Sequence, residues 1–150
     1  MRHEPADQDR VMQEINHGSE RSVVLVIGAV IEDRLQSAIE QLLTHLTEDE
    51  KVDFFGENGP AGDFASRIKI SYAMRAIPKW MRDDINIIRE IRNAFAHSQL
   101  QISFDDKEVA DLCLQFNRRK EADQFISHFD SFKMVGITIW VQIYDPIFWT

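Results

Sequence analysis

Three residues in the second half of the chain, Arg92, Asn93 and His97, carry side chains that could together cleave RNA without a metal ion. An imidazole with a pKa of about 6.5 can take the proton of a ribose 2′-hydroxyl, and a guanidinium can hold the phosphate as negative charge builds in the transition state. On a helix Asn93 and His97 lie one turn apart on one face, whereas Arg92 is rotated from His97 by about 140°. Arg92 would therefore have to wrap around the helix or reach the site from a second copy of the chain.

The segment from Arg92 to His97 resembles the Arg-Asn-x-x-x-His motif of HEPN-domain proteins. That superfamily of small helical bundles includes toxin-type endoribonucleases and many nucleotide- or partner-binding modules. The resemblance implies that Arg92, Asn93 and His97 form a site shared between two protomers, hence a homodimer with RNA as substrate. A histidine one turn after an asparagine at a helix end can equally be a cap or a structural contact.

A second segment, from Gly59 to Tyr72, joins a glycine-proline loop to a helix that carries basic residues near its start. The candidate binding residues are Gly59, Gly62, Asp63, Arg67, Lys69 and Tyr72. The glycines permit backbone angles that other residues resist, and Asp63 is placed to cap the helix. Arg67 and Lys69 could bind an anion or a partner there. Because Asp63 already supplies negative charge at the cap, a purely structural turn is the favoured interpretation.

This loop resembles the Gly-Pro-x-Gly-Asp…Arg-x-Lys…Tyr segment of the mannitol repressor family, and the order of the surrounding helices matches over about residues 22–116. The resemblance implies an all-α fold and a role in repressing or regulating transcription of sugar-uptake genes through protein partners. It implies no enzymatic activity. We expect such a regulator to be a homodimer. The HEPN-type, metal-independent endoribonuclease is the alternative.

Direct reading of DNA is not expected from the one junction that could form a helix-turn-helix unit. Ile77 and Pro78 join two predicted helices, but the second helix carries Asp83, Asp84 and Glu90 among its basic residues. A DNA-reading helix needs basic and amide side chains on its exposed face.

The elements that must position these residues are predicted to be helices in one domain spanning residues 1–150. We expect a bundle of about six helices, covering residues 7–17, 20–46, a stretch from 63, 78–97, 106–116 and a last helix from about 119, with a further short helix at 47–55. Residues 22–31 and 136–144 are rich in β-branched side chains and read locally as strands. Helix is favoured because a lone strand would have no evident pairing partner.

Composition indicates a cytoplasmic protein with an ordinary hydrophobic core. Of its 150 residues 44% are hydrophobic, and the single cysteine, Cys113, sits in an apolar run as a buried structural thiol would. The N-terminus lacks a secretory signal, and the longest apolar run, Val23 to Ile31, is about half of what crosses a membrane. The five histidines show no metal-ligand spacing, and no phosphate-binding glycine loop is present, so neither metal nor cofactor is expected.

Charge is unevenly distributed along the chain. The net charge is −8, yet the stretch from Arg67 to Arg92 holds seven basic and three acidic residues, a local charge of +4. An acidic chain does not coat nucleic acid over its whole surface, since phosphate binding depends on Lys and Arg. A local basic surface and a set of solvated helix faces are both consistent with this pattern.

Overall fold

The computed structural model describes residues 5–99, 101–117 and 126–143, which contain seven α-helices and no β-strand. The helices are α1 (Pro5–His17), α2 (Glu20–Leu42), α3 (Glu48–Phe55), α4 (Phe64–Ala73), α5 (Lys79–His97), α6 (Lys107–Cys113) and α7 (His128–Ile143). The predicted all-α bundle is confirmed. None of these helices is long and apolar enough to span a membrane.

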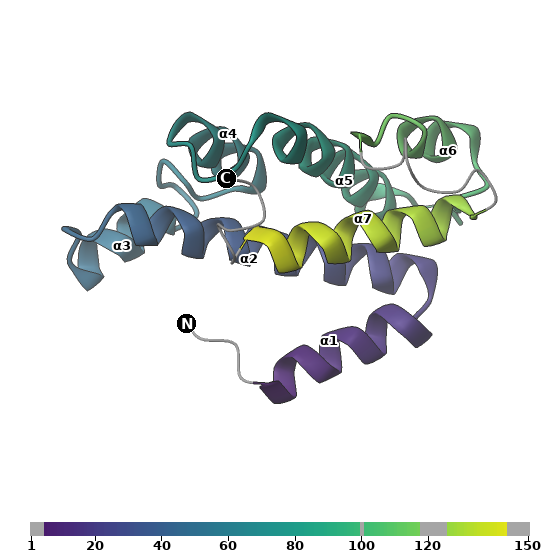
Figure 1. The fold of residues 1–150 in the computed structure, drawn as a ribbon, viewed down its shortest axis with the longest axis horizontal. Coiled ribbons are helices and arrows are strands. Elements are labelled where there is room, and N and C mark those ends of the chain that lie inside the picture. Colours follow the sequence, from purple (N-terminus) through teal and green to yellow (C-terminus); the bar gives the residue numbers. More distant parts are fainter. Residues whose placement is uncertain (1–4, 100, 118–125, 144–150) are drawn as a thin grey trace.

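Helix α2 is the centre of the bundle (Figure 1). It packs against α7 along much of its length, against α4 and α5 on another side, and against α1. Helix α3 lies at one end of α2, and α6 packs on α5 and α7 near the other end. The core between these helices is made of branched aliphatic and aromatic side chains, among them Ile27, Ile31, Ile88 and Phe132, each at most 1% exposed.

The two stretches with strand-like composition are helical in the described residues. Val23, Val24, Ile27 and Ile31 are at most 1% exposed, because this half of α2 is enclosed by α1, α5 and α7. A helix covered on several sides tolerates apolar residues around most of its circumference. Residues 136–143 belong to α7, and residue 144 lies outside the described residues.

Local capping signals determine several helix starts. Ser19 accepts a hydrogen bond from the Ser22 N–H at 3.2 Å, and Asp63 accepts one from the Ser66 N–H at 2.7 Å. Thr47 begins the predicted capping box, in which its side chain and that of the glutamate three residues later each accept from the other's backbone N–H. These starts therefore follow the sequence closely.

Two helices end earlier in the structure than the sequence predicted. Helix α2 ends at Leu42 instead of residue 46, because Leu43 leaves the helical backbone and packs against a small apolar cluster of Ile39, Phe55 and Ala61. Helix α6 ends at Cys113 instead of residue 116, and Phe116, beyond the helix, is 1% exposed in the main core. The start predicted near residue 119 for the last helix lies outside the described residues.

Candidate functional site

Arg92 lies on the inner face of α5, the face that carries Ile85, Ile88 and Phe95. Its guanidinium carbon is 5.3 Å from the centroid of the Phe64 ring on α4, and its buried Nε has no hydrogen-bond partner among the described atoms. Its stem also fills space beside α2, where a Cβ added to Gly28 would lie 2.9 Å from the Cγ of Arg92. Arg92 is thus a packing residue between three helices.

His97 and Asn93 occupy the outer face of the same helix. His97 is exposed at the last position of α5, and Asn93, one turn earlier, is half-buried. In the same turn, the Phe95 carbonyl accepts a hydrogen bond at 2.6 Å from Arg21 on α2. Asn93 and His97 therefore lie on one face of α5, and Arg92 points away from His97, as the predicted rotation of about 140° between these two residues requires. Within one chain the three side chains do not converge.

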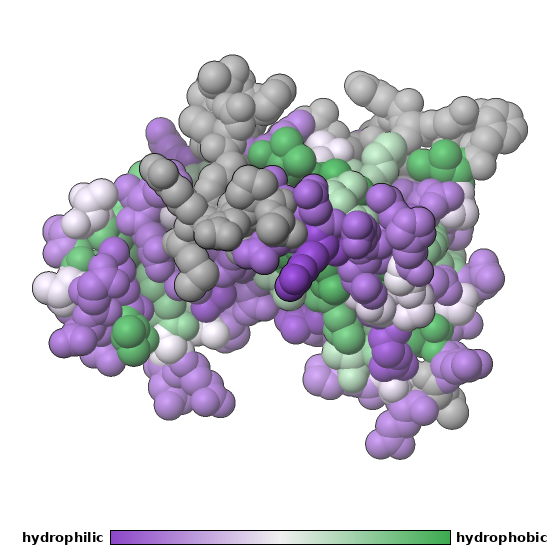
Figure 2. Space-filling view, turned by 90° about the horizontal axis from the view of Figure 1, so that it is seen from below, coloured by the Kyte–Doolittle hydropathy of each residue, from purple (hydrophilic) through white to green (hydrophobic). Residues whose placement is uncertain are grey.

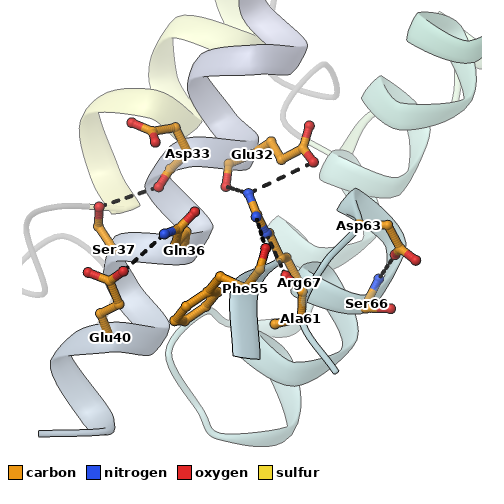
Figure 3. Close-up of polar contacts among 10 residues, drawn as sticks. All are labelled: Glu32, Asp33, Gln36, Ser37, Glu40, Phe55, Ala61, Asp63, Ser66 and Arg67. Carbon is orange, nitrogen blue, oxygen red and sulfur yellow. Dashed lines mark hydrogen bonds and ion pairs between the residues drawn. The ribbon is translucent and has the colours of Figure 1, made fainter. Parts of the chain in front are cut away.

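Arg67 is enclosed by backbone carbonyl groups from three parts of the chain (Figure 3). Its Nε donates to the Ala61 carbonyl at 2.9 Å, its Nη2 to that of Phe55 at 3.3 Å, and its Nη1 to that of Glu32 at 3.5 Å. The Glu32 carboxylate is a further 3.9 Å partner of Nη1. A guanidinium has five N–H donors, and these contacts use all three of its nitrogens. We call this arrangement the Arg67 clamp; it leaves little capacity for a ligand.

Glycine is required in the adjacent loop by close backbone approach. A Cβ added to Gly59 would lie 2.1 Å from the Asp53 carbonyl oxygen, and one added to Gly62 would lie 2.2 Å from that of Gly56. The sequence argument from unusual backbone angles was wrong here, because no glycine in the described ranges has a positive φ. At the end of the loop, the Ser66 N–H bonds to the carboxylate that caps α4 and lowers the pKa of Asp63.

The six candidate binding residues of this segment fall into two groups. Gly59, Gly62, Asp63 and Arg67 build the loop and its closure. Lys69 and Tyr72 are exposed on α4. The structure does not gather the six around one cavity.

A groove between α2 and α3 is a concave surface that sequence reasoning missed. It encloses about 560 Å³ and is lined by Asp33, Gln36, Ser37, Glu40, Glu48, Lys51, Val52, Phe55 and Gly56. Three of these side chains are carboxylates, and the one cation, Lys51, pairs with Glu48 at 3.3 Å. Val52 is 71% exposed at its edge. We call this feature the α2–α3 groove.

The groove and the Arg67 clamp share a residue. Phe55 lines the groove, and its carbonyl oxygen accepts from Arg67 (Figure 3). On α2, Gln36 donates to Glu40 at 3.0 Å within the groove. No group of three or more metal-ligating side chains is clustered anywhere in residues 5–99, 101–117 or 126–143. The groove is therefore an acidic surface with an apolar edge, held from beneath by the clamp.

A family model described as mannitol repressor matches residues 7–131 of the chain. The chain belongs to the mannitol repressor family. The match extends well beyond the resemblance seen from residue 22 to 116, and reaches from α1 into the first turn of α7. No curated protein sequence matches the chain.

Two solved structures share the bundle of this mannitol repressor family member. One is the complex of MtlR with HPr from Escherichia coli, with 16% identity, a TM-score of 0.73, and coverage of 92% of this chain and 98% of that one. The other is YggD, a possible transcriptional regulator from Shigella flexneri 2a, with 14% identity, a TM-score of 0.66, and coverage of 91% and 98%. At these identities the likeness concerns the fold alone.

Several arginines of this mannitol repressor family member are committed to contacts within the bundle. Arg67 serves the clamp, Arg92 packs on Phe64, and Arg34, 7% exposed, lies 5.2 Å from the ring centroid of Trp140. Of the seven basic residues between Arg67 and Arg92, these contacts take up Arg67 and Arg92.

Proposed function

We propose that this chain is a cytoplasmic regulator of transcription that acts by binding a protein partner and does not read DNA directly. Membership of the mannitol repressor family supports a regulatory role. One similar structure is a complex of MtlR with HPr and another is a possible transcriptional regulator, which makes a protein partner the first hypothesis for this chain. The observation that carries the proposal is the α2–α3 groove.

The chemistry of the groove suits a partner that presents basic and apolar side chains together. The carboxylates of Asp33, Glu40 and Glu48 exceed the single positive charge of Lys51. Opposite charges across an interface steer encounter and fix the register of binding. Val52 gives the partner an apolar contact, since covering an exposed side chain removes its surface from water. Figure 2 shows this end of the molecule as mainly hydrophilic with isolated hydrophobic residues.

Replacing Glu40 with lysine is expected to weaken the binding of HPr about tenfold, which corresponds to about 1.4 kcal/mol. The substitution places a like charge opposite the basic side chains of the partner. Isothermal titration calorimetry of the purified full-length chain with purified HPr measures the effect. Glu108→Lys is the matched control, because Glu108 is an exposed carboxylate on α6, away from the groove.

The two parts of this proposal can fail separately. Equal loss of affinity in Glu40→Lys and Glu108→Lys would contradict the groove as the docking surface. Failure of the unsubstituted chain to bind HPr would contradict the choice of HPr as partner. Val52→Ser, which removes the apolar contact at the edge without changing the charge, should also lower the affinity for HPr.

The alternative function is an HEPN-type ribonuclease that acts as a homodimer. The exposure of His97 beside Asn93 favours it, and the packing of Arg92 on Phe64 opposes it. We expect mixed RNA incubated with the unsubstituted chain in EDTA to remain intact on a denaturing gel. Cleavage that disappears in both His97→Ala and Arg92→Ala, with circular dichroism showing both variants folded, would establish the nuclease and overturn the regulator. Sedimentation measures whether the required dimer forms.

A further inference from the structure

Arg75 holds a backbone conformation that ordinarily belongs to glycine. Its φ is 60°, and no other non-glycine residue in the described part of the chain has a positive φ. Its N–H donates to the Tyr72 carbonyl at 3.0 Å, and the Ala76 N–H donates to the Ser71 carbonyl at 2.8 Å. This pair of bonds is the Schellman motif that ends many helices, with Arg75 at the position where glycine is usual.

Arginine at this position costs conformational free energy that glycine would not. The left-handed region brings the Cβ of an L-residue close to the following carbonyl oxygen. The carbonyl groups at the end of α4 would be satisfied equally well with glycine, because both hydrogen bonds are made by backbone N–H groups. Because glycine could end α4 without this cost, the strained backbone at Arg75 indicates that the arginine side chain has a use of its own.

The side chain of Arg75 lines a pocket at the junction of α4 and α5. The pocket encloses about 500 Å³ and is lined by Tyr72, Ala73, Arg75, Ile77 and Pro78. That volume lies within the range of ordinary binding sites. The ring of Tyr72 is covered by the guanidinium of Arg82, whose carbon lies 4.2 Å from the ring centroid. The site therefore combines apolar walls with cationic groups at its edge.

Charge near the junction is positive although the chain is acidic overall. Lys69 is one turn before Tyr72 on α4, and Lys79 directly follows Pro78; both lysines are exposed. One carboxylate, Asp83, offsets part of this charge by accepting from the Nε and Nη2 of Arg82 at 3.0 and 2.9 Å. The next residue, Asp84, is fully buried and faces Asn117, on another side of α5. Within the described residues Arg75 forms no ion pair, and its side chain is exposed.

We propose that the α4–α5 junction binds an acidic segment of a protein partner. A carboxylate of the segment pairs with the guanidinium of Arg75, whose planar fork suits a two-point contact, and an adjacent apolar side chain rests on Ala73 and Pro78. Nucleic acid fits less well, because a net charge of −8 repels a phosphate backbone beyond the local basic residues and the apolar walls offer it nothing. The site is separate from the α2–α3 groove and does not depend on it.

The variant Arg75→Gly tests two effects separately: the conformational strain at Arg75, through thermal stability, and the role of its side chain, through peptide affinity. We expect its Tm to rise by about 2–4 °C, since glycine relieves the strained conformation in a domain of this size. Its affinity for a fluorescein-labelled peptide rich in glutamate and containing leucine should fall about fivefold or more, as fluorescence anisotropy at low salt would show. Lys107→Ala is the matched control, because it also removes one exposed positive charge, on α6.

Higher thermal stability with lower peptide affinity in Arg75→Gly, and unchanged affinity in Lys107→Ala, supports the proposal. Three results would overturn it. The unsubstituted chain could leave the peptide unbound, the two variants could lose affinity equally, or duplex DNA could bind more tightly than the peptide and depend on Arg75. A Tm that falls in Arg75→Gly would contradict the strain argument, because arginine would then serve the fold. Persistence of peptide binding in Glu40→Lys distinguishes this site from the groove.

Discussion

Arg67→Met is expected to lower the free energy of unfolding by about 3 kcal/mol. Hydrogen bonds from a charged donor stabilise a fold more than neutral ones do, and a buried carbonyl left without a donor carries a desolvation penalty. The substitution keeps an unbranched apolar stem and removes every donor. The carbonyls of Glu32, Phe55 and Ala61 then lose their side-chain donor together. These carbonyls come from α2, the end of α3 and the loop, so the whole α3–α4 connection should loosen.

Urea denaturation followed by circular dichroism measures this effect. Lys69→Met is the control, because Lys69 is exposed two residues further along α4 and its loss should change stability by less than about 0.5 kcal/mol. Arg67→Lys should recover only a small part of the loss, since an ammonium group is a compact point charge that lacks the fork of a guanidinium. An Arg67→Met variant as stable as the unsubstituted chain would mean that the clamp contributes little.

The Arg67 clamp explains why the segment that resembles the mannitol repressor motif needs its glycines, its aspartate and its arginine at these positions. Gly59 and Gly62 are needed because carbonyl oxygens lie within 2.2 Å of the position of a Cβ. Asp63 starts α4, and Arg67 then closes the loop on α2. The motif therefore specifies how the chain returns from α3 to α4. It specifies part of the fold of the family, and the two surfaces that we propose for binding lie next to it.

Features that depend on a few neighbouring residues could be predicted from the sequence. The capping box of Thr47 and the cap of Asp63 each involve partners three residues away, so spacing alone defines them. The end of α2 could not be predicted in the same way. Leu43 leaves the helix to join Phe55 and Ala61, residues that only the completed fold brings to it.

In the candidate sites, too, features set by neighbouring residues could be predicted, whereas contacts between residues far apart in the sequence could not. Helical rotation correctly separated His97 from Arg92, which the structure places on the core face of α5. The position of Arg92 against Phe64 and Gly28 depends on how three helices meet. The α2–α3 groove was missed because Glu40 and Glu48 belong to different helices that meet only through the intervening turn.

Gly136→Leu is expected to lower the free energy of unfolding by about 3 kcal/mol or more, at the upper end of overpacking effects, or to prevent folding. Gly136 is buried where α7 packs on α2, and an added Cβ would lie 2.7 Å from the Cγ2 and 3.2 Å from the Cδ1 of Ile27. A leucine must push the two helices apart. Val141→Leu is the control, because Val141 is 53% exposed on the same helix and should tolerate the change.

A second substitution tests whether the contact with Ile27 is the cause. Ile27→Ala alone should cost about 2–5 kcal/mol by leaving a cavity in the core. In the double variant, the leucine that replaces Gly136 can occupy that cavity. The double variant should therefore lose about 1–3 kcal/mol less free energy of unfolding than the sum of the two single losses. Strict additivity in urea denaturation would show that the leucine is accommodated elsewhere. A favourable coupling would show that the absence of a side chain at Gly136 is what allows α7 to pack closely on Ile27 of α2.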